Sequence, residues 1–158
     1  PMAGGPSTVA LAAAAAAGGF FPFLAGAYLS PGRLADDVAE LRDQSSSAFG
    51  VNVFAPSPDH PSMLDDARSY AARLAPWAAS AGVPLGEPRY DDDAFDAKVD
   101  VLEAAAPAVV SFAFGWPPAT VVERLQAAGS QVWVTVNDPA EADWARELGV
   151  DGLVAQGW

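Results

Sequence analysis

The sequence predicts a parallel α/β fold. Apolar segments of strand length alternate with helical segments along most of the chain, a pattern typical of parallel strands joined by crossover helices. The expected strands are also almost continuously apolar, as in AVVSFAFG at residues 108–115, which indicates burial on both faces of the sheet. Both a (β/α)8 barrel and an open doubly wound sheet are compatible with these two observations.

The order of the expected elements follows from apolar periodicity and from helix start and stop signals. Ser7 and Thr8 can cap the first helix, which Gly18 and Gly19 end, and Pro31 opens the second helix. The expected strands span residues 1–5, 20–27, 49–55, 108–115, 131–137 and 151–156. The expected helices run through residues 12–17, 31–42, 64–77, 95–102, 119–128 and 139–148.

A long insertion follows the third expected strand. About 50 residues separate the strands at 49–55 and 108–115, roughly twice what a bare βα connection needs. Because it begins directly after a strand, the insertion should lie on the carboxyl-terminal side of the sheet, where barrel active sites are built. We interpret residues 56–89 as an insertion or lid that walls a site; plain surface decoration is the alternative.

The composition narrows the possible functions. The chain of 158 residues is long enough for one domain with its own core, and 51% of its residues are hydrophobic. It contains no cysteine, which excludes disulfides and thiolate metal sites and is compatible with a cytoplasmic protein. The formal net charge is −12 and basic residues do not cluster, so we expect no nucleic-acid partner. The oligomeric state is left open.

Two features invite a function that the sequence does not support. The apolar run from Val9 to Leu29 is long enough to span a membrane, but glycines and Pro22 interrupt it. Two short buried elements explain the run better, so no membrane partner is expected. His60 is the only histidine and lies in a proline-flanked turn, without partners for a catalytic triad or a metal. No metal site is therefore expected.

Glycines and polar residues recur where the expected strands end. In a parallel barrel such positions meet at one edge, where glycines let a flat ligand approach the backbone and amides match the donors and acceptors of a ring. Turns also favour these residue types, so each position is weak evidence alone. The set is Met2–Gly5, Gly26–Tyr28, Asn52, Phe114–Gly115, Thr135 with Asn137, and Gln156–Gly157.

Six segments together resemble the nitronate monooxygenase family, formerly called 2-nitropropane dioxygenases. They occur in the family's order and span the whole chain. The segments are PMAGGPST at 1–8, FLAGAYL at 23–29, FGVNVF at 49–54, LGEPRYDDD at 85–93, VVSFAFG at 109–115 and VAQG at 154–157.

The resemblance implies an FMN-dependent oxidoreductase on an incomplete (β/α)8 barrel, with about six of its eight βα units in residues 1–158. The family's FMN contacts would fall on Met2, Ala3, Asn52 and Gln156. The implied reaction oxidises an alkyl nitronate with O2 to a carbonyl compound and nitrite. The histidine base of the family would lie beyond Trp158, so the chain is expected to be an inactive fragment that includes no catalytic residue.

Two alternatives remain at this point. A flavin-dependent enoyl-acyl-carrier-protein reductase shares the barrel and much of the AQG region, but it would need a nicotinamide donor. A catalytically inactive α/β module that acts through its insertion is the alternative from a different functional class.

Overall fold

The computed structural model describes residues 1–57 and 61–157, and the chain divides into two compact units. One unit contains Pro1–Pro56 and Asp93–Trp158 and holds the sheet. The other, Ser57–Asp92, contains the long helix α3 (Pro61–Ala81). The insertion expected from the sequence is thus a compact unit of its own. Its interpretation as a lid stays a prediction.

The sheet has five parallel strands in sequential order, so each strand pairs with the strand before it. A doubly wound sheet reverses its strand order at a switch point, whereas a barrel adds each new strand on the same side. Sequential order therefore selects the barrel type of winding, and the predicted fold class is confirmed. The strands are β1 (Phe23–Ala25), β2 (Gly50–Phe54), β3 (Val109–Ala113), β4 (Gln131–Val136) and β5 (Gly152–Ala155).

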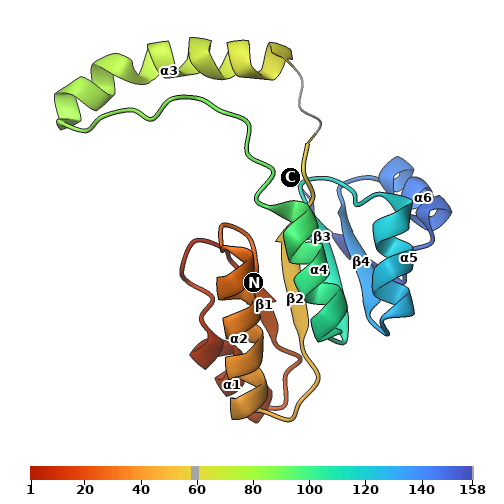
Figure 1. The fold of residues 1–158 in the computed structure, drawn as a ribbon. Coiled ribbons are helices and arrows are strands. Elements are labelled where there is room, and N and C mark those ends of the chain that lie inside the picture. Colours follow the sequence, from red (N-terminus) through yellow and green to blue (C-terminus); the bar gives the residue numbers. More distant parts are fainter. Residues whose placement is uncertain (58–60, 158) are drawn as a thin grey trace. The chain divides into compact units, whose positions relative to one another are not determined.

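Helices of the same unit pack in a row against one another. Contacts join α1 to α2, α2 to α4 and α4 to α5, and Figure 1 shows α2, α4 and α5 side by side over the sheet. Leu34, Phe112 and Leu125 are fully buried between these layers. The helices are α1 (Val9–Ala17), α2 (Pro31–Gln44), α4 (Phe95–Ala105), α5 (Ala119–Ala127) and α6 (Pro139–Leu148).

Helices α1 and α2 begin directly after residues whose side chains cap them. The Thr8 hydroxyl accepts a hydrogen bond from Leu11 N (3.1 Å) at the start of α1, and Ser30 accepts one from Arg33 N (3.2 Å) at the start of α2. The apolar run at the N-terminus is divided between α1 and β1, as predicted. Within the described part of the chain, no helix combines the length and the apolar character needed to cross a membrane.

The two faces of the sheet differ in burial, contrary to the expectation that both are buried. On the helix-covered face Val51, Val110 and Val132 are fully buried and form the core. On the opposite face, which we call the open face, Asn52 and Trp133 are only half-buried. Because the described helices pack against one face, buried apolar residues alternate with partly polar ones along β2 and β4.

Three elements depart from their predicted form. Residues 1–5 form turns rather than a strand, because Met2 and Ser7 bond to each other: Met2 N donates to Ser7 Oγ (2.7 Å) and Ser7 N donates to Met2 O (3.3 Å). The first strand covers only Phe23–Ala25 of the expected 20–27. The helix expected through residues 64–77 is longer than predicted, since α3 runs from Pro61 to Ala81 and continues past Pro76.

Close packing at the end of β1 requires a glycine. A Cβ added to Gly26 would lie 2.9 Å from Val53 Cγ1 and 3.2 Å from Asn52 O, while Gly26 N donates to that same oxygen (2.7 Å). We expect Gly26→Ala to lower the free energy of unfolding by about 1–3 kcal/mol, measured by urea denaturation. Gly32→Ala, where nothing lies within 4 Å, is the control and should be neutral or stabilising. Equal losses in both variants would contradict this packing account.

Candidate functional site

Glycines and polar residues do follow the strands at the carboxyl-terminal end of the sheet. Gly26 comes directly after β1, Phe114 after β3, Asn137 after β4 and Gln156 after β5. Since all five strands are parallel, these positions belong to the same end of the sheet. The predicted arrangement of strand ends therefore holds for these four positions.

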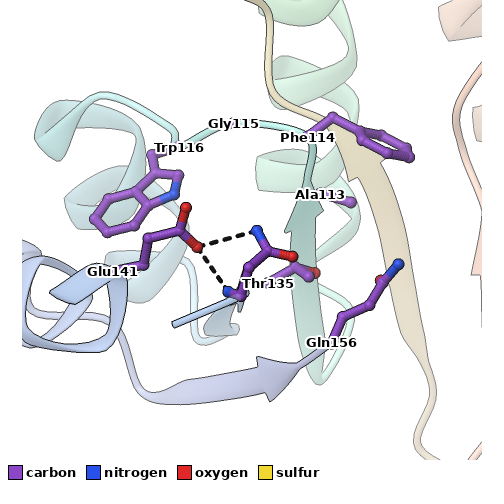
Figure 2. Close-up of a pocket in the computed structure, with 8 residues that line it drawn as sticks. Ala113, Phe114, Gly115, Trp116, Thr135, Glu141 and Gln156 are labelled. Atoms are coloured by element: carbon purple, nitrogen blue, oxygen red, sulfur yellow. Dashed lines mark hydrogen bonds between the residues drawn. The ribbon is translucent and has the colours of Figure 1, made fainter. Parts of the chain in front are cut away.

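A pocket of about 290 Å³ lies at the ends of β3, β4 and β5, and we call it the strand-end pocket. Its polar groups come from Thr135, Asn137, Glu141 and Gln156 (Figure 2). Its volume is near the lower limit of small-molecule sites, which suits part of a ligand or a small one. The lining residues are Ala113, Phe114, Gly115, Trp116, Thr135, Asn137, Glu141 and Gln156.

Glu141 fixes the polar side of this pocket. Its Oε2 accepts hydrogen bonds from Asn137 N (2.7 Å) and Asn137 Nδ2 (3.1 Å), which Figure 2 shows as dashed lines. Asp138 caps α6 by accepting from Glu141 N (2.9 Å), while the Glu141 carboxylate reaches back to Asn137, one residue before the cap. The cap holds the loop after β4 in place. Glu141 was not predicted as a site residue, although the Asp138-x-x-Glu141 spacing is a capping signal that could have identified it.

Asn52 lies elsewhere than the strand-end prediction put it. It is the third of five residues in β2, two positions before the strand ends, and it does not line the strand-end pocket. Its Nδ2 donates to Ser111 Oγ (2.9 Å) and Ser111 O (3.2 Å) on β3. The side chain therefore belongs to the open face, where it makes a polar link between two strands.

The remaining predicted contacts fall in two places. Gln156 lines the strand-end pocket together with Thr135. Met2, which is 64% exposed, and half-buried Ala3 lie in the N-terminal turns and do not line that pocket. The role of all four residues in FMN binding stays a prediction, and His60 lies outside the described residues.

Three aromatic side chains from consecutive strand ends form a row beside the pocket. Tyr28 contacts Phe54 edge to face, with ring centroids 5.3 Å apart, and Phe54 contacts Phe114 in the same way at 4.8 Å. We call these three residues the aromatic row. Phe114 also lines the strand-end pocket, so the row and the pocket are contiguous.

A buried ion pair lies behind one end of this row. Lys98 of α4 is 1% exposed, and its Nζ lies 2.7 Å from Asp93 Oδ2. The two carboxylate oxygens of Asp93 in turn accept from Tyr28 N, at 3.0 and 3.3 Å. Asp93 is therefore the counter-ion that the described residues provide for the buried Lys98 ammonium.

The donor set of the pocket suits the edge of a flat polar ring. Thr135 offers a hydroxyl and Gln156 an amide, which can donate and accept hydrogen bonds, and Trp116 and Phe114 add aromatic surface. The described lining includes one carboxylate and no Lys, Arg or His side chain. Such a lining offers hydrogen bonds and aromatic surface to a flat polar ring.

A barrel-type parallel sheet with a polar pocket at the carboxyl ends of its strands defines the class: an α/β protein whose site is built where barrel enzymes place theirs. The profile of the nitronate monooxygenase family matches residues 1–158. This chain therefore belongs to the nitronate monooxygenase family, whose members are flavin-dependent oxidoreductases.

Individual relatives agree with the family match. A probable nitronate monooxygenase of Staphylococcus aureus (strain JH9) is 29% identical over 161 residues, covering 99% of this chain and 44% of the relative. The solved nitroalkane oxidase from Streptomyces ansochromogenes is 39% identical with a TM-score of 0.90, covering 99% of this chain and 44% of that chain. FabK from Thermotoga maritima is 24% identical with a TM-score of 0.68, covering 98% and 38%, and shares the fold. The chain thus spans less than half the length of these relatives.

Proposed function

We propose that this chain forms the flavin-ring side of an FMN-dependent nitronate monooxygenase that oxidises alkyl nitronates with O2 to a carbonyl compound and nitrite. The observation that carries the proposal is the strand-end pocket, whose hydroxyl and amide groups match a ring edge. The family match over residues 1–158 supports the reaction class. FMN would supply the electron transfer, while the protein supplies orientation and a fixed polar environment.

The proposed contacts divide between the pocket and the open face. Gln156 would hydrogen-bond the ring edge from the end of β5, and Asn52 would do so from the open face of β2. Met2 and Ala3 would approach the ring through the N-terminal turns, where Gly4 and Gly5 have positive φ (82° and 118°). Left-handed backbone of this kind favours glycine, and glycine leaves room for a flat ligand near the chain.

The pocket residues orient the ligand rather than move protons. The Glu141 carboxylate accepts two hydrogen bonds from Asn137 at the start of α6, so we assign it to holding the loop. Trp116 and Phe114 would contribute apolar surface on the sides of the pocket that they line. Together these residues would give the ring a polar edge and an apolar side.

Titrating the flavin-free protein, expressed from its complete reading frame, with FMN tests this assignment. We expect flavin fluorescence to be quenched on binding, and Gln156→Ala to weaken binding by about 2–13-fold, which corresponds to one hydrogen bond of about 0.5–1.5 kcal/mol. Gln131→Ala, at the amino-terminal end of β4, is the matched control and should bind FMN as the wild type does. Equal affinity in the two variants would remove Gln156 from the site, and an absence of binding by the wild type would refute the flavin assignment.

A further inference from the structure

We propose that the Asp93–Lys98 ion pair is a positioning element for Tyr28, and that the aromatic row receives the alkyl part of the substrate. This inference rests on the proposed function, because it names the residues that would select among nitronates. It concerns the substrate side of the site and requires no particular contact with the flavin.

The location of the row ties it to the site. Tyr28, Phe54 and Phe114 come from the ends of β1, β2 and β3, and their rings touch in sequence. Phe114 is shared with the strand-end pocket. A ligand seated in that pocket would therefore have an apolar wall of three rings beside it.

The backbone of the row indicates a functional rather than a stabilising role. Tyr28 and Phe114 both have φ of 63°, a left-handed conformation that bulky residues rarely adopt. Their side chains are nevertheless 73% and 75% exposed, so burial of the rings within the described chain offsets little of this strain. Residues that keep a strained backbone without any gain in packing are often found at ligand-binding sites.

The ion pair explains how Tyr28 keeps this conformation. Asp93 accepts from Tyr28 N through both carboxylate oxygens, and Lys98 Nζ holds the Oδ2 atom at 2.7 Å. Because Lys98 is buried in α4, its ammonium is fixed relative to the core, and the carboxylate is fixed between two contacts. The backbone of Tyr28 is thus tied to α4 through Asp93, which lies 65 positions further along the chain.

The chemistry of the aromatic row indicates which part of the substrate it would bind. Three aromatic rings present apolar surface, and the described lining of the adjoining pocket has no cationic side chain. The row therefore suits the uncharged alkyl chain of the substrate rather than its anionic nitronate group. A longer alkyl chain should gain more from the row than a short one, because it buries more apolar surface.

The test compares nitronates of nitroethane and 1-nitropentane in the protein expressed from its complete reading frame. We expect the wild type to have a higher kcat/KM for the longer substrate than for the shorter one. Tyr28→Ala should reduce the ratio of these two kcat/KM values roughly tenfold, through a higher KM for the longer substrate. Lys98→Met should reduce the ratio in the same way. Arg146→Met, which breaks the surface Arg146–Asp143 pair (3.2 Å) on α6, is the matched control and should keep the ratio.

A double variant distinguishes loss of Tyr28 positioning from loss of folding. Asp93→Asn with Lys98→Met removes both charges while nearly keeping both volumes, so it leaves no buried charge unpaired. It should show the same loss of chain-length preference as Lys98→Met. A wild-type ratio in this folded variant would overturn the positioning role, and a wild-type ratio in Tyr28→Ala would overturn the role of the row.

Equilibrium binding separates this inference from the proposed function. Straight-chain carboxylates resemble nitronates in shape and charge but do not react. Calorimetry with propionate and hexanoate therefore measures binding to the aromatic row without turnover. We expect tighter binding of hexanoate, and loss of that preference in Tyr28→Ala. If the wild type oxidises no nitronate but keeps this preference, the proposed function is wrong and the binding role of the aromatic row is supported. If it oxidises nitronates but binds both carboxylates equally, the aromatic row does not bind the alkyl chain.

Discussion

Replacing Asp93 with asparagine should lower the free energy of unfolding by about 3 kcal/mol, because it leaves a buried ammonium without its counter-ion. Lys98 is 1% exposed, and Asp93 is the counter-ion that the described chain provides for it. The reverse change, Lys98→Met, should cost only about 1 kcal/mol. The methionine keeps the apolar packing of the buried stem, and the Asp93 side chain, 21% exposed, can still reach water.

Urea denaturation followed by circular dichroism measures this asymmetry. Asp143→Asn is the matched control, since Asp143 and its partner Arg146 are 66% and 77% exposed, and an exposed ion pair contributes less than about 1 kcal/mol. Similar losses for Asp93→Asn and Asp143→Asn would mean that the Asp93–Lys98 pair is no more important to stability than a surface pair.

Local sequence signals predicted the helices well. Pro31 and Pro139 begin α2 and α6 as expected, and Thr8, Ser30 and Asp138 cap their helices through hydrogen bonds within four residues. Such signals depend on neighbouring residues alone, so the sequence contains them in full. The alternation of helices and strands likewise predicted the parallel sheet.

Features that depend on distant partners were harder to predict. The apolar segment 20–27 is longer than β1 because only residues 23–25 find partners on β2. Asn52 was grouped with strand ends, whereas the register places it beside Ser111 in mid-strand. The contact between Tyr28 and Asp93 joins residues that are 65 positions apart, and no periodicity in the sequence reports it.

The candidate site was predicted in outline only. The sequence singled out Thr135, Asn137 and Gln156 as strand-end residues, and the structure brings them into one pocket. It did not indicate that Trp116 and Glu141 would complete the lining, because their positions depend on how the loops after β3 and β4 fold over the strand ends.

The largest effect that we expect is functional. The protein expressed from its complete reading frame should oxidise alkyl nitronates in the presence of O2 and release nitrite without added NADH or NADPH. Within the described chain, the strand-end pocket and the aromatic row offer a polar edge and an apolar wall, which suit a ring and a small alkyl substrate. A small nitronate needs little more than such a pocket above the flavin, and the family match makes this reaction class the expected one.

The most direct test of this account is nitrite release by the FMN-loaded protein, measured together with O2 consumption and with no nicotinamide present. We predict nitrite production from ethyl nitronate that stops when O2 is removed. An FMN-loaded protein that ignores nitronates and instead oxidises NADPH with an enoyl thioester would contradict the proposal and establish the reductase in its place.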